Sequence, residues 1–290
     1  MARKSLGQNF LMDQAAVSRI AELACSCRHG VMVELGAGTG NLTMALAQRC
    51  SRIIAFEIDR RLLEWHEQVC RLPENVELRK GDILAISYRD LAAVEGGALR
   101  VAGNLPYNIS SQVVFALCRQ AAYITDAWLL FQKEMAKRIV SPPGSRDYGI
   151  LSVVSQYSGK VTIEMDLPPT VFSPKPKVYS SLVHFDFTER SGPVAADYDF
   201  FIQTVRAAFS QRRKKILNCI RSYFKQGREE MEQALVAAGI EPDARAETLD
   251  VARFVGLSDI LFKHIRQKQG DISGFLNPAR ENKAANSPGR

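Results

Sequence analysis

A glycine-rich turn between a short apolar run and a helical stretch constrains this chain more than any other feature. Residues 31–35 are apolar enough for a buried strand, Gly36-Ala37-Gly38-Thr39-Gly40 follows, and residues 42–49 have a helical pattern. Glycine lets the backbone adopt positive φ and approach a bound nucleotide-like ligand closely. The turn therefore predicts a strand–turn–helix unit with a ligand site at the carboxyl end of the strand.

The same alternation of strand and helix patterns continues to about residue 131. Further strands are expected at 52–57, 76–79, 99–103 and 127–131, and helices at 14–23, 59–70 and 110–119. Such an alternation favours a mostly parallel sheet that is covered on both faces. Two more strand-like runs, 160–166 and 180–187, flank a proline-rich segment and predict an antiparallel hairpin that closes the sheet. Residues 1–190 are therefore predicted to form a doubly wound, Rossmann-like α/β domain.

The pattern changes after a polar junction at residues 189–194. Residues 201–224 and 231–238 have helical periodicity, which predicts a small all-helical domain over residues 195–268. Residues 269–290 are polar and contain Gly, Pro and Asn, so we expect a disordered tail there.

Positive charge is concentrated in one segment of the predicted helical domain. The formal net charge is +7, and residues 206–228 contain eight Lys and Arg residues and no acidic residue. Apolar side chains of 201–224 share one helical face, so the basic side chains are expected on the other. A local positive field suggests a polyanionic partner, although a merely solvated helical face is the simpler alternative.

Several classes of protein are disfavoured by what the sequence lacks. No apolar run approaches the roughly 18 residues of a membrane span, and no secretory signal follows Met1, so we expect a cytoplasmic protein without a membrane partner. Six cysteines without C-x-x-C spacing indicate small apolar side chains rather than a disulfide framework. Four scattered histidines match no zinc motif, so no metal site is expected.

Acidic residues follow the predicted strands at the same edge as the glycine turn. Glu57 ends the second strand, where a carboxylate can accept hydrogen bonds from two ribose hydroxyls. Asp82 follows the third strand and can accept from an adenine amino group. Asn41 stands where a dinucleotide fingerprint has its third glycine, which argues against a nicotinamide dehydrogenase.

The tetrapeptide Asn104-Leu105-Pro106-Tyr107 follows the fourth strand and contains the parts needed to activate an exocyclic amine. The lone pair of the amine is delocalised into the adenine ring, and two fixed acceptors would localise it and direct it at an electrophilic methyl group. The acceptors would be the Asn104 carboxamide oxygen and the Leu105 carbonyl, while Pro106 stiffens the turn. Tyr107 would stack on the base, and Phe172 could cover its other face.

These motifs resemble those of the KsgA-type small-subunit ribosomal RNA adenine dimethyltransferases over about residues 3–266. The matching segments are Leu6 to Leu11, Glu34 to Gly40, Glu57 to Asp59, Gly81-Asp82, Gly103 to Ser110, Val171 to Val178, Gln211 to Lys214, and Arg245 to Glu247. The resemblance implies that Asn9 and Leu11 fold over S-adenosylmethionine. It also implies that Gly36, Glu57, Asp82 and Asn104 touch this cofactor, and that Tyr107 and Phe172 hold the target base.

The resemblance further implies dimethylation of two adjacent adenosines near the 3′ end of small-subunit RNA, within an immature 30S particle. The expected phosphate contacts are then basic residues of the helical domain. They are Arg212, Arg213, Lys214, Lys215 and Arg221. A monomer is expected. Two alternatives stay open: an Erm-type methyltransferase of large-subunit RNA, and a non-catalytic assembly or transcription factor on the same fold.

Overall fold

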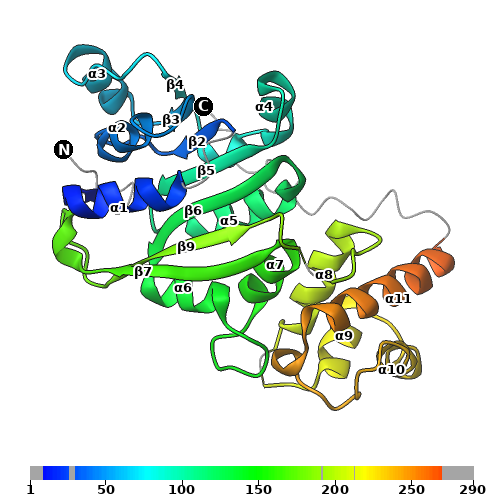
Figure 1. The fold of residues 1–290 in the computed structure, drawn as a ribbon. Helices are drawn as coiled ribbons and strands as arrows, with labels where there is room; N and C mark the ends of the chain where they lie inside the picture. Colours follow the sequence, from blue (N-terminus) through cyan, green and yellow to red (C-terminus); the bar gives the residue numbers. More distant parts are fainter. Residues whose placement is uncertain (1–8, 26–29, 191, 212, 270–290) are drawn as a thin grey trace, which may run out of the picture. The chain divides into compact units, whose positions relative to one another are not determined.

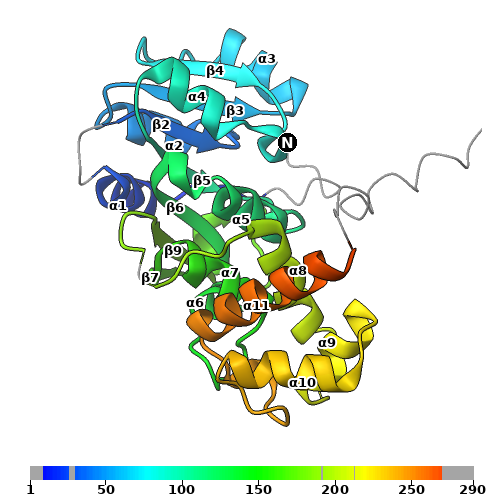
Figure 2. The same ribbon diagram turned by 90° about the vertical axis from the view of Figure 1, so that its right-hand side faces the viewer.

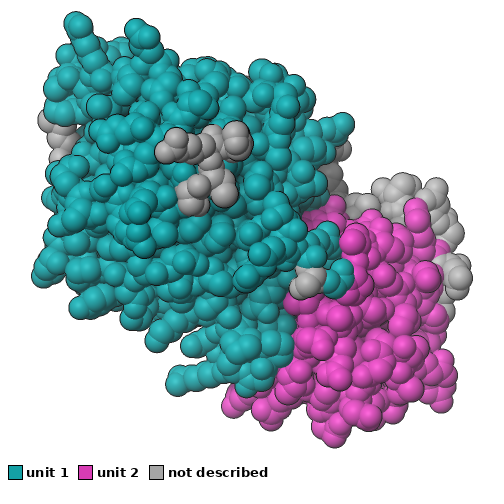
Figure 3. All heavy atoms as spheres, in the orientation of Figure 1, with its two compact units in different colours: residues 1–192 teal, residues 193–290 magenta. Residues whose placement is uncertain are grey.

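A computed structural model describes residues 9–25, 30–190, 192–211 and 213–269. The chain divides into two compact units, residues 1–192 and 193–290 (Figure 3). The division lies inside the polar junction at 189–194. The catalytic role expected for the first part and the RNA contacts expected for the second stay predictions. Apart from Gln269, the tail expected at 269–290 lies outside the described residues.

A seven-stranded sheet forms the centre of the first unit, in the order β4-β3-β2-β5-β6-β9-β7 (Figure 1). The first five strands in this order run parallel, and β9 is antiparallel to both of its neighbours. The strands are β2 (Met32–Leu35), β3 (Ile53–Glu57), β4 (Val76–Lys80), β5 (Leu99–Asn104), β6 (Ile124–Gln132), β7 (Lys160–Leu167) and β9 (Ser180–Asp186). The predicted α/β sheet and its antiparallel closure are confirmed. The chain order reverses between β2 and β5, where such sheets bind ligands.

Helices of the first unit cover the sheet. They are α1 (Gln14–Ala24), α2 (Asn41–Ala47), α3 (Arg60–Gln68), α4 (Tyr88–Glu95), α5 (Ser110–Arg119), α6 (Lys133–Val140) and α7 (Ile150–Ser158), with short 3-10 turns at Ile83–Ala85, Ala121–Tyr123 and Pro169–Val171. Figure 2 shows α1 and α5 on opposite sides of β5 and β6. In α1, Val17 and Ile20 are each 1% exposed, and burial of such a side chain contributes about 1.5–3 kcal/mol. Helices α4, α6 and α7 were not predicted.

A small two-stranded ribbon joins distant parts of the first unit. Strand β1 (Phe10–Leu11) pairs antiparallel with β8 (Phe172–Ser173), so that Leu11 lies opposite Phe172. The Met12 amide extends the ribbon by donating to the Val171 carbonyl at 2.8 Å. Asp13 then caps α1 by accepting from the Ala16 amide at 2.8 Å. We call residues 9–12 the strap.

The second unit is helical, as predicted, but its helices differ from the expected ones. They are α8 (Tyr198–Ala208), α9 (Ile216–Phe224), α10 (Arg228–Ala237) and α11 (Val251–Gln269), with a 3-10 turn at Ala246–Thr248. The single helix predicted at 201–224 is wrong, and α11 was not predicted. Lys215 is extended and the Ile216 amide donates to the Ala244 carbonyl at 2.9 Å. Helix α8 ends at Ala208, and the first amide of α9 therefore finds its acceptor outside the helix. Among the described helices, none is long and apolar enough to cross a lipid bilayer.

Candidate active site

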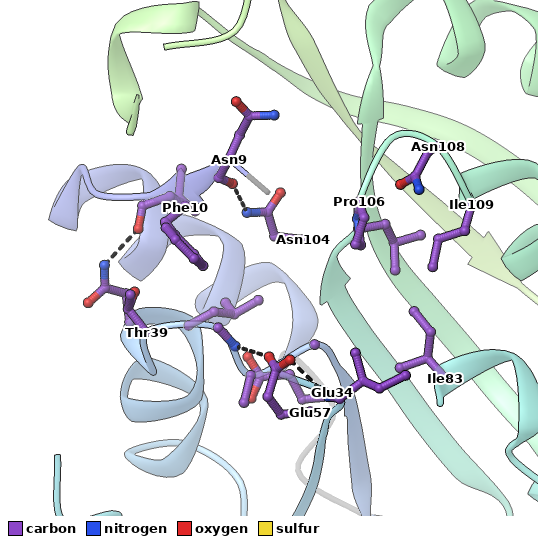
Figure 4. A pocket seen from close by; sticks show the side chains of 18 of the residues that line it. Asn9, Phe10, Glu34, Thr39, Glu57, Ile83, Asn104, Pro106, Asn108 and Ile109 are labelled. Atoms are coloured by element: carbon purple, nitrogen blue, oxygen red, sulfur yellow. Dashed lines mark hydrogen bonds between the residues drawn. The ribbon is translucent and has the colours of Figure 1, made fainter. Parts of the chain in front are cut away.

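A pocket of about 260 Å³ opens at the carboxyl ends of β2, β3 and β5. Figure 4 shows the strap residues Asn9 and Phe10 on one side of it, and Pro106, Asn108 and Ile109 on the other. The structure brings most of the sequence-predicted residues together here. Those that line the pocket are Asn9, Leu11, Gly36, Glu57, Asp82, Asn104, Leu105 and Pro106.

Glu57 fixes the glycine turn from the end of β3. Its Oε2 accepts from the Gly38 amide at 2.9 Å, and its Oε1 accepts from the Ile58 and Asp59 amides at 2.8 Å each. The glycines at 36, 38 and 40 all have positive φ, and a β-carbon at Gly38 would lie 3.2 Å from the Phe10 ring. The turn therefore depends on glycine, and the buried carboxylate holds it in place.

Asp82 follows β4 at the wall of the pocket. Its Oδ1 accepts from the Leu84 amide at 2.9 Å, which caps the 3-10 turn at Ile83–Ala85 and fixes the direction of the side chain. The carboxylate is exposed, and the apolar side chains of Ile83, Leu84 and Ile109 line the same pocket. This wall combines an acceptor with apolar surface, which suits a heterocyclic base.

Two asparagine side chains hold the strap over the pocket. Asn104 Nδ2 donates to the Asn9 carbonyl at 2.8 Å, drawn in Figure 4, and Asn41 Nδ2 donates to the Leu11 carbonyl at 2.7 Å. A carbonyl can only accept, so the Asn104 amide nitrogen must face the strap. The Asn104 carboxamide oxygen is therefore left to accept from another group. Asn41 was considered in the sequence only as a departure from a dinucleotide motif.

Tyr107 and Phe172 do not line the pocket in this structure. The Tyr107 hydroxyl forms a 2.9 Å hydrogen bond with Ser180 Oγ at the start of β9, and burial raises the Tyr107 pKa. Phe172 is 4% exposed and packs in the apolar core with Leu11 and Leu167. Stacking of a base on Phe172 thus requires a movement of the ribbon between β1 and β8.

Glu34 lines the pocket, although no separate role was predicted for it from the sequence. It is 1% exposed, and among the described residues its Oε2 has no hydrogen-bond partner. Burial is the main cause that raises the pKa of Glu34 to about 8; the Thr43 hydroxyl opposes this shift and the Glu57 charge adds to it. A buried unpaired carboxyl oxygen beside a pocket is a signal of a cationic or hydrogen-bond-donating ligand.

The predicted RNA-binding residues lie in the second unit and do not share one helix. Arg213, Lys214 and Lys215 are exposed in the segment between α8 and α9, and Arg221 is exposed on α9. Arg212 lies outside the described residues. Lys215 Nζ is 3.7 Å from an Asp243 carboxylate oxygen. Arg213 and Lys214 therefore present their charge from a turn, which corrects the expected basic helical face.

The strand order and the pocket at the switch between β2 and β5 define a class I methyltransferase. A solved dimethyladenosine transferase from Plasmodium falciparum has the same fold, with a TM-score of 0.69 at 24% identity over 90% of this chain and 98% of that one. The solved 23S rRNA methyltransferase ErmE gives a TM-score of 0.62 at 26% identity over 88% and 100% of the two chains. Within this class, the chain belongs to the ribosomal RNA adenine dimethylase family, which it matches over residues 1–263.

Curated relatives share most of their length with this chain. Ribosomal RNA small subunit methyltransferase A of Geobacter metallireducens is 42% identical over 89% of this chain and 94% of its own. The protein of the same name from Geobacillus thermodenitrificans is 38% identical over 91% and 92%. The family predicted from the motifs is confirmed, and the names of these relatives favour the small-subunit type over the Erm type.

Proposed function

We propose that this protein transfers methyl groups from S-adenosylmethionine to the N6 amine of two adjacent adenosines near the 3′ end of small-subunit ribosomal RNA. The family and the curated relatives support the substrate. The observation that carries the chemistry is the direction of the Asn104 amide. Its nitrogen is bound to the Asn9 carbonyl, so its oxygen stays available at the pocket where β5 ends.

The residues of the pocket fit S-adenosylmethionine, which supplies an electrophilic methyl group when bound. The unpaired Glu34 Oε2 suits the ammonium of a methionine moiety, because a buried carboxyl oxygen gains most from a donor. Glu57 would hold the ribose hydroxyls and Asp82 the adenine amino group. Gly36 allows the close approach of the ligand, while Asn9 and Leu11 cover it from the strap.

The chain would activate the target amine with neutral acceptors. The Asn104 carboxamide oxygen and the Leu105 carbonyl would accept from the two amino hydrogens and turn the nitrogen lone pair toward the methyl group. Pro106 limits the freedom of this turn, and Tyr107, fixed by Ser180, would stack on the base from one side. After transfer the amine nitrogen is acidic enough to lose a proton to water, so no residue is assigned as a general base.

We further propose that the substrate is the RNA of an immature 30S particle in the cytoplasm. Its phosphates would be contacted by Arg212, Arg213, Lys214, Lys215 and Arg221. We also propose that the protein acts as a monomer. A non-catalytic factor would not need the acceptor geometry at Asn104.

The test compares methyl incorporation into undermethylated small subunits and into large-subunit RNA, with labelled cofactor. We expect dimethyladenosine in the small-subunit RNA. Asn104→Ala should lower the rate by about 100-fold or more, as for other removed transition-state contacts. Asn104→Asp keeps an acceptor and should retain more activity than the alanine variant. Asn218→Ala, at an exposed position on α9, is the matched control.

Label that enters only large-subunit RNA would favour the Erm-type reaction instead. Binding of small subunits without any methyl transfer would favour the non-catalytic alternative. If Asn104→Ala incorporates methyl groups as fast as Asn218→Ala, the proposed role of the amide is wrong.

A further inference from the structure

Two cysteines that are far apart in the sequence meet in the first unit. Cys25 is the residue that ends α1, and Cys50 lies in the loop between α2 and β3. Their sulfur atoms are 2.7 Å apart, in a hydrogen bond that either thiol can donate. Carbon atoms in van der Waals contact rest about 3.5–4.0 Å apart, whereas a disulfide bond measures about 2.05 Å. A small movement of either side chain would therefore bring the sulfurs to bonding distance.

The surroundings of the two thiols differ in a way that suits a redox reaction. Cys25 is 8% exposed, whereas Cys50 is only half-buried. The hydrogen bond from Cys25 is the largest cause that lowers the pKa of Cys50, and the charges of Arg100 and Arg49 add to it against the effect of burial. The same hydrogen bond and burial raise the pKa of Cys25. Cys50 is thus the better thiolate, and Cys25 keeps its proton.

We propose that Cys25 and Cys50 form a reactive dithiol site that low-molecular-weight disulfides oxidise to an intramolecular disulfide. The Cys50 thiolate attacks one sulfur of the small disulfide, whose S–S bond breaks and releases one thiolate. The Cys25 thiol then gives its proton to solvent, and its sulfur attacks Cys50 Sγ and releases the second thiolate. Two protein thiols and one small disulfide thereby become one protein disulfide and two small thiols.

The bond would close a chain segment that contains β2, the glycine turn and α2. It would also join the end of α1, the helix that follows the strap, to the segment that enters β3. Closing a loop of this length restricts the unfolded chain more than the folded one, so the oxidised protein should have the higher Tm. This dithiol site is separate from the pocket and does not depend on the proposed methyl transfer.

The test uses the full-length protein in glutathione buffers of increasing oxidised fraction, followed by alkylation of the remaining thiols and mass spectrometry. Wild type should lose two alkylation sites together and carry no lasting glutathione. Cys25→Ser should trap a mixed disulfide on Cys50, because the second thiol is missing. Cys50→Ser should form neither a mixed disulfide nor an intramolecular disulfide at Cys25. The Tm of each reduced variant verifies that it is folded. Cys25→Ala repeats the test of Cys25→Ser with a different replacement.

Cys27→Ser is the matched control, since Cys27 is a sequence neighbour that lies outside the described residues. It should form the disulfide as wild type does, and only proteins with both Cys25 and Cys50 should gain Tm on oxidation. A wild-type protein that keeps glutathione on Cys50, or whose thiols stay fully alkylated when the small thiols are mostly oxidised, would overturn the proposal. A disulfide that survives Cys25→Ser but disappears in Cys27→Ser would do the same.

Discussion

Two carboxyl groups at the base of the pocket have opposite surroundings. Glu57 accepts hydrogen bonds from three backbone amides, one of which belongs to the glycine turn. Glu34 is fully buried and, among the described residues, has an oxygen without any donor. The sequence could predict Glu57, because an acid at a strand end is a recognisable signal. It could not predict Glu34 in the same way, since the lack of a donor depends on side chains from several elements.

The buried Glu34 carboxyl should make stability depend on pH. The unfolded chain ionises this group near 4.5 and the folded chain near 8, so the folded protein binds more protons between these values. The free energy of unfolding therefore falls as pH rises through this window, by up to about 1.4 kcal/mol per pH unit. Glu34→Gln removes the titration. The free energy of unfolding, measured with urea, should fall less from pH 5 to pH 8.5 in this variant than in wild type.

Glu67→Gln is the control for this measurement, because Glu67 is exposed on α3 and its replacement should leave the wild-type profile unchanged. If the free energy of unfolding falls by the same amount from pH 5 to pH 8.5 in Glu34→Gln and in wild type, Glu34 is not held protonated.

At the scale of elements, the long alternating segments were predictable and the short ones were not. Strands β2 to β6 follow from apolar runs and turn residues, whereas β1 and β8 are two residues each and pair across about 160 positions of sequence. Their pairing depends on the folded sheet, so no local pattern indicates it. The start of α9 is likewise not marked by a local pattern, because the Ile216 amide binds the Ala244 carbonyl, which lies far along the chain.

The strap should respond to loss of one asparagine amide. Asn41→Ala removes the 2.7 Å hydrogen bond to the Leu11 carbonyl, which is worth about 1 kcal/mol, or roughly fivefold in Kd if the strap covers the cofactor. We expect weaker S-adenosylmethionine binding by calorimetry and faster hydrogen exchange at the Leu11 and Met12 amides. The control Asn218→Ala should change neither quantity. Unchanged exchange in Asn41→Ala would show that the strap does not rely on this bond.

At the scale of the whole molecule, the net charge is +7. The local concentration of positive charge at residues 206–228 matters more for an RNA partner than this total. The sequence predicted which residues carry this charge, but it placed them on a helical face. The structure places Arg213 and Lys214 in an exposed turn of the second unit. A turn can follow an irregular phosphate backbone, and its contacts would position the RNA without reading its bases.

Replacing Arg213 and Lys214 together by alanine should weaken binding of small subunits and raise KM, with little change in kcat. Each lost phosphate contact should reduce the slope of log Kd against log salt by about 1. Filter binding at several salt concentrations measures this slope. Lys263→Ala, an exposed lysine of α11 in the same unit, is the control. A variant with the wild-type slope would exclude this turn from the RNA interface.

The ribbon between β1 and β8 has a consequence for how two methyl groups reach one amine. The strap shares backbone hydrogen bonds with the segment that carries Phe172. With the proposed cofactor beneath the strap, a spent donor would leave when the strap opens. Exchange of the spent cofactor for a new one would then weaken the contacts with the target nucleotide between the two methyl transfers. We therefore expect distributive catalysis, in which monomethyladenosine accumulates early in a time course and is later consumed by other enzyme molecules.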